Sequence, residues 1–123
     1  MSSTTVIMKR LESEHNPDTF TVFRPLGEGI KAEMNVVIKE IFDTLGGKSL
    51  LKSSGDVYVK PNAVDSRPYT HTRPEVVEAV IRYWFEAGAR NVCLIENSTQ
   101  CTYTRLVFKL TGYKSMLKSC PRS

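Results

Sequence analysis

The sequence predicts an α/β fold, with a small, three-layer-like open sheet of mainly parallel strands on which helices pack. Strand-like apolar segments alternate with amphipathic helical segments in the order β-β-α-β-α-β-α, which is the pattern of βαβ units. The chain has 123 residues, of which 41% are hydrophobic and 24% charged, as in ordinary soluble domains. We therefore expect one domain over residues 1–123, with N-terminal strands in 1–28, a core in 29–118 and a tail in 119–123.

The first half of the chain contains two predicted strands and one helix. Residues 4–9 and 19–23 are rich in β-branched and aromatic residues, as strands are. Residues 29–47 then repeat apolar side chains at helical spacing, and Gly46-Gly47 is a typical helix stop. The predicted apolar stripe consists of Ile30, Met34, Val37, Ile38, Ile41, Phe42 and Leu45.

The second half contains two strands, at residues 56–60 and 91–96, and two helices. Thr72, Pro74 and Glu75 have the form of a capping box, which predicts Thr72 as the N-cap of a helix that ends at Gly88. The apolar face of that helix consists of Val76, Val77, Val80, Ile81, Trp84 and Phe85. A third helix is expected over residues 103–110. A sheet this small suggests a fold that is incomplete at its C-terminal side.

The positive charge of the chain is concentrated near its C-terminus. The net charge is +4, and residues 101–123 contain no acid. This segment is a basic face for nucleic acid or phosphates, a solvated helix edge, or a tail that packs on further chain. Residues 116–120 are expected to be exposed, which would suit an interaction module. No nucleic-acid motif accompanies the charge, so we favour the solvated edge and do not expect a nucleic-acid partner. The five cations are Arg105, Lys109, Lys114, Lys118 and Arg122.

The cysteines and the hydropathy of the chain indicate in which cellular compartment the protein is expected. Cys93, Cys101 and Cys120 form no CxxC pair, and their odd number argues against a disulfide framework and for a reducing, cytoplasmic location. Their spacing also does not suit a zinc or iron–sulfur site, and Cys93 is expected to be a small buried residue of a strand. No apolar run approaches the roughly 20 residues of a membrane span, and the apolar patch before Lys9 is too short for a secretory segment, so export is not expected.

Polar side chains follow both central strands. In open α/β sheets, ligands bind beyond the carboxyl ends of the strands, so these side chains are expected to converge on one cleft. Cations there would attract an anion, amides and hydroxyls would orient it, and a histidine with a carboxylate could move protons or hold a metal ion. Each residue also has a plain structural explanation, as a solvated charge, a turn or a cap. The first strand is followed by Lys60, Asn62, Asp65, Ser66, Arg67, Thr70, His71, Thr72 and Arg73, and the second by Glu96, Asn97, Ser98, Thr99 and Gln100.

Roles within this cleft follow from the residue types. Lys60 and Arg73 would hold the anion, His71 would act as a general base or metal ligand, and Glu96 would be its carboxylate partner. Asp65 could join them around a hard cation. The orienting groups would be Asn62, Thr72, Ser98 and Thr99. The sequence specifies neither a metal nor a cofactor.

Four separated motifs, which lie in three segments of the chain, resemble a known family. "GDVYVKPNAV", "THTRPEVVEAVIRYWFEAGARNVCLIENS" and "TGYK" are similar to the opening of the family named domain of unknown function 362, over about residues 30–118. The resemblance places Lys60, Asn62, Thr72, Pro74, Glu96 and Ser98 on motif positions, with glutamate at 96 where the family most often has aspartate. It also implies a domain that runs past residue 123. Many members carry ferredoxin-like cysteine clusters, which this chain lacks.

Three functions are consistent with these observations. The first is a cytoplasmic domain, which could be part of an enzyme, that binds an anionic small molecule or a metal at the strand ends. The second is a truncated interaction module in which another chain completes the sheet. The third is a redox protein that uses the iron–sulfur cluster of a partner.

Overall fold

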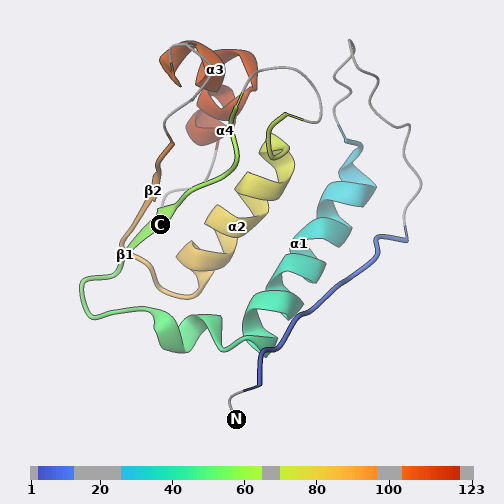
Figure 1. The fold of residues 1–123 in the computed structure, drawn as a ribbon, viewed down its shortest axis with the longest axis vertical. Coiled ribbons are helices and arrows are strands. Elements are labelled where there is room, and N and C mark those ends of the chain that lie inside the picture. The colour runs from blue at the N-terminus through green and yellow to red at the C-terminus, as the bar shows by residue number, and fades with distance from the viewer. Residues whose placement is uncertain (1–2, 13–25, 65–69, 97–103, 120–123) are drawn as a thin grey trace.

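The computed structural model of the chain describes residues 3–12, 26–64, 70–96 and 104–119 (Figure 1). Helices and strands are mixed along the chain, and the sheet is small and open, so the predicted α/β class is confirmed. The elements in order are α1 (Glu28–Thr44), the 3-10 helix η1 (Gly47–Leu50), β1 (Asp56–Val59), α2 (Pro74–Glu86), β2 (Asn91–Leu94), α3 (Thr104–Leu110) and α4 (Tyr113–Ser119).

The sheet is a single βαβ unit. β1 and β2 pair in parallel, from Asp56 opposite Asn91 to Val59 opposite Leu94, and α2 connects them. Within the described residues the sheet has two strands, which is fewer than expected. The strand predicted at 19–23 lies outside the described residues.

The strand predicted at residues 4–9 is wrong. These residues have no regular structure and run alongside α1, and no strand of the described residues pairs with them (Figure 1). The Lys9 ammonium lies 3.3 Å from the Glu40 carboxylate, and Leu11 packs against the buried side chains of α1. A β-rich composition produces a strand only where a partner supplies the backbone hydrogen bonds.

Helix α2 is the centre of the molecule, because it has buried side chains on two sides. Ala79 packs with Ile30 and Met34 of α1, which confirms the inner part of the α1 stripe. Val77 and Ile81 pack on the other side, against β2, α3 and α4. The sequence predicted a single apolar face that did not include Ala79 and Tyr83, although both are buried. Tyrosine is only intermediate in its tendency to be buried, which made Tyr83 hard to predict.

One face of the sheet is covered and the other is exposed. Val92 and Leu94 of β2 point inward and contact the cluster around Ile81, while Tyr58 and Cys93, which are opposite each other in the register, are exposed. The prediction that Cys93 is buried is therefore wrong, because successive side chains of a strand point to opposite faces. Cys101 and Cys120 lie outside the described residues.

The C-terminal part of the described chain is more ordered than expected. The third helix is confirmed as α3, but a further helix, α4, follows Gly112 and buries Tyr113 and Met116 in the core. The expected exposed stretch at 116–120 is therefore wrong for Met116, which is 7% exposed. Among the described residues, no helix has the length and apolarity needed to cross a membrane.

Candidate functional site at the strand ends

The polar residues that follow β1 and β2 meet at one end of the sheet. Both strands run toward α3 and α4, and α2 begins at the same end of the molecule (Figure 1). The Lys60 ammonium lies 3.1 Å from a carboxylate oxygen of Glu96, so the two strand ends are joined by an ion pair. The side chain of Lys60 is 66% exposed, whereas that of Glu96 is only 6% exposed. The predicted convergence of the two strand ends is thus present for these two residues.

The loop after β1 folds back on itself. The Thr72 amide donates to the Asn62 carbonyl at 2.8 Å, and the Asn62 amide donates to the Thr72 hydroxyl oxygen at 3.2 Å. Next to this pair, Ala63 and His71 form an isolated antiparallel β-bridge. The side-chain amide of Asn62 also donates a hydrogen bond to the Thr70 carbonyl at 3.2 Å. The backbone of residues 62–64 is therefore held against 70–72. Asp65, Ser66 and Arg67 lie outside the described residues.

The N-cap of α2 is Arg73, and the predicted capping role of Thr72 is wrong. Pro74 occupies the first turn as expected, but no side chain caps the helix. The Thr72 hydroxyl oxygen instead accepts a hydrogen bond from the Asn62 backbone amide, because Thr72 is paired with the other side of the loop. Arg73 lies 3.4 Å from the Glu75 carboxylate, whose other oxygen accepts from the Leu26 amide at 3.1 Å.

The two predicted anion-binding cations therefore differ in their surroundings. The side chain of Arg73 is 22% exposed and faces Glu75, which is 9% exposed, so its charge is used largely within the protein. Lys60 also has a carboxylate partner, but two thirds of its side chain is in solvent. An ammonium has three hydrogen-bond donors, and one contact with Glu96 leaves donor capacity for a ligand. Lys60 is the more available of the two cations.

Tyr113 lies beneath the loop of this site and contacts its backbone. No role was predicted for it from the sequence. Its side chain is fully buried, and its hydroxyl donates to the Thr72 carbonyl and lies 3.4 Å from the Asn62 carbonyl. The His71 ring stands edge-on to the tyrosine ring, with the centroids 6.1 Å apart. Burial raises the pKa of Tyr113 to about 12, and the negative charge of Glu96 adds to this shift. Tyr113 thus lies among His71, Glu96 and the loop.

Several predicted residues cannot be placed in this arrangement. Ser98 and Thr99, with Asn97 and Gln100, lie outside the described residues. Within the parts of the chain that the structure describes, no group of three or more histidine, cysteine, aspartate or glutamate side chains could hold a metal ion. The described part of the site offers one exposed ammonium, one nearly buried carboxylate, an imidazole and a paired backbone loop. Such a set can bind an anion and orient it.

Comparison with known proteins gave one match. The family model described as "Domain of unknown function (DUF362)" matches residues 57–122, which is just over half of the chain. The match begins at β1 and not near residue 30 as the sequence motifs suggested, so it includes the whole strand-end site and excludes α1. No curated protein and no solved structure showed significant similarity. The chain belongs to the DUF362 family.

Proposed function

We propose that the strand-end site binds an anionic small molecule and that Lys60 is its principal contact. The observation that carries this proposal is the ion pair between the exposed Lys60 and the nearly buried Glu96, 3.1 Å apart. A buried carboxylate has little freedom to move, so it holds the otherwise flexible ammonium at the strand end. A cation held in place in this way loses less side-chain entropy on binding than a free surface lysine.

The neighbouring groups support the same proposal. Asn62 and Thr72 are fixed by their mutual hydrogen bonds, so the exposed side chain of Asn62 would present a defined orientation to the ligand. Arg73 would add positive potential from the start of α2. Ser98 and Thr99 would contribute hydroxyl groups from the loop after β2. If the site belongs to an enzyme, His71 and Glu96 are the groups that would move protons.

Replacing Lys60 with alanine tests this proposal. We expect the affinity for inorganic phosphate or a small carboxylate, measured by isothermal titration calorimetry, to fall by roughly tenfold to a hundredfold, the usual loss for a charge-assisted hydrogen bond. A ligand at a hundredfold excess over its dissociation constant should stabilise the unmodified chain by about 2.7 kcal/mol.

Lys52→Ala is the matched control, because Lys52 is an exposed lysine that precedes the start of β1, whereas Lys60 follows its end. An equal loss of affinity in both variants would show that only the net charge matters. Unchanged binding in Lys60→Ala would contradict the proposed site.

A second candidate function, an interaction module, is favoured by the uncovered face of the sheet. Tyr58 is 66% exposed and Ile95 is 45% exposed on this face, and parallel sheets are usually covered on both faces. We expect the molar mass measured by light scattering to rise with protein concentration if another copy covers this face. A monomer over the whole concentration range would argue against self-association through the sheet.

A further inference from the structure

Helices α3 and α4 carry a surface that is positive and contains no acid. Its residues, which we call the basic surface, are all exposed, and none forms an ion pair with any described residue. In both helices the cations are four residues apart, so each pair lies on one side of its helix. The basic surface consists of Arg105 and Lys109 on α3 and of Lys114 and Lys118 on α4.

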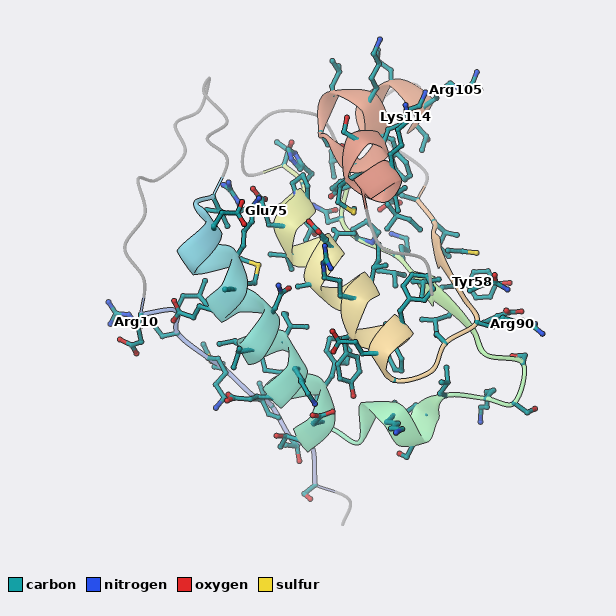
Figure 2. All side chains as sticks on the ribbon, turned by 180° about the vertical axis from the view of Figure 1, so that it is seen from behind. Arg10, Tyr58, Glu75, Arg90, Arg105 and Lys114 are labelled. Atoms are coloured by element: carbon teal, nitrogen blue, oxygen red, sulfur yellow. The ribbon has the colours of Figure 1, made fainter. Side chains whose placement is uncertain are left out.

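The basic surface adjoins the strand-end site. Tyr113, the first residue of α4, donates to the Thr72 carbonyl in the loop after β1, and Lys114 is the next residue along the chain. Both strands run toward α3 and α4 (Figure 1), and Arg105 and Lys114 lie at that end of the molecule in Figure 2. A ligand at Lys60 would therefore be close to a second group of cations.

The charge distribution makes this end distinct from the rest of the molecule. The net charge of the chain is +4, and the four cations of the basic surface account for all of it, so the remaining residues sum to zero. Elsewhere, the charged side chains are largely matched locally, as in the pairs Lys39–Asp43 and Arg82–Glu78. A localised positive field attracts anions to one end of a protein and raises their local concentration.

We infer that the ligand of the strand-end site is a small polyanion with two or more phosphate or carboxylate groups. One group binds at Lys60, and the others lie over the basic surface. The inference rests on the proposed function and extends it to a class of ligand. The two cations of each helix repel each other, and a singly charged ligand at Lys60 leaves that repulsion in place. A multivalent anion relieves it.

The test is a charge series on the intact chain. Phosphate, pyrophosphate and tripolyphosphate are titrated by calorimetry at low ionic strength, together with acetate and citrate as carboxylate counterparts. The probe variant is Lys114→Gln with Lys118→Gln, and the control is Lys48→Gln with Lys52→Gln. Both variants remove two exposed lysines and change the net charge equally. Lys48 belongs to η1 and Lys52 follows it, and η1 lies at the end of the molecule opposite α3 and α4 (Figure 1). Thermal melts establish that both variants fold.

We expect affinity to rise along the phosphate series, and the probe variant to lose about tenfold for tripolyphosphate while the control loses little. The phosphate and carboxylate arms identify which group is preferred. Equal affinities along both series, or equal losses in the two variants, would overturn the inference. Binding that depends on Lys114 and Lys118 but not on Lys60 would also overturn it, because the basic surface would then be a separate site. A different result would reject only the polyanion inference and still support the proposed function. In that case Lys60→Ala would lose phosphate binding, but the affinity would not rise with the charge of the ligand.

Discussion

Replacing Tyr113 with alanine is expected to lower the free energy of unfolding by about 3–5 kcal/mol, which is the usual cost of removing a buried aromatic ring. The ring is fully buried, lies in the cluster with Ile81 and Val107, and stands edge-on to Phe108 at a centroid distance of 5.5 Å. Its removal would leave a cavity between α4 and the loop after β1. Urea denaturation followed by circular dichroism measures the loss.

Tyr113→Phe separates the ring from the hydroxyl group. This variant keeps the packing and removes the donor to the Thr72 carbonyl, so we expect a loss of only about 1 kcal/mol at neutral pH. A loss in Tyr113→Phe as large as that in Tyr113→Ala would contradict the packing explanation.

The pH dependence of the same pair isolates the hydroxyl. The folded-state pKa of Tyr113 is raised to about 12 by burial, above the value near 10 of an unfolded tyrosine. The corresponding stability is fully present below about pH 10 and is lost as the pH rises toward 12, by an amount on the order of 2 kcal/mol. Tyr113→Phe should show a smaller loss of stability over this range than the unmodified chain. The remaining loss in Tyr113→Phe would come from other groups, including Tyr83, whose pKa is also raised by burial.

Replacing Gly55 with alanine is expected to cost about 2–4 kcal/mol. Gly55 has a φ of +69°, a conformation that costs a residue with a Cβ roughly 1–2 kcal/mol. The added methyl group would also lie 3.0 Å from Cβ and 3.1 Å from the backbone nitrogen of Arg90, which is overpacking of the kind that costs about 1–3 kcal/mol. The Gly55 carbonyl accepts from the Arg90 amide at 2.7 Å, so Gly55 sets the approach of the chain to the start of β2.

Gly46→Ala is the matched control for this prediction. Gly46 has a similar φ of +74°, but an added methyl group would meet only the Ser49 hydroxyl, at 3.3 Å. We expect it to show the backbone cost alone, about 1–2 kcal/mol. Equal losses in the two variants, measured by thermal unfolding, would show that the contact with Arg90 does not contribute.

The central βαβ unit could be predicted from the sequence because its signals are local. β1, α2 and β2 each have a clear hydrophobic period, and Gly88 marks the end of α2 through its φ of +105°. The prediction of a strand at 4–9 failed for a non-local reason, since among the described residues no strand pairs with it. Helix α4 was missed because a glycine such as Gly112 can either end the last helix of a segment or connect two short helices. The sequence does not distinguish these two cases.

The site was predicted in part for the same reasons. The polar residues after each strand are visible in the sequence, and topology brings Lys60 to Glu96. Whether a cation is available to bind an anion depends on which carboxylates lie near it in space. No sequence motif marks the contact between Arg73 and Glu75. The role of Tyr113 depends on the packing of α4 against a loop about forty residues earlier in the chain. "TGYK" marks the position but not the contact.

The most direct test of the strand-end site is a phosphate titration of the isotope-labelled chain, followed by amide chemical shifts in NMR spectra. The site predicts that the largest changes occur at residues 60–64, at 70–73 and at Lys114, and that they disappear in Lys60→Ala. Changes confined to the groove between α1 and α2, around Lys39, Arg82 and Tyr83, would place the anion elsewhere and contradict the proposed site.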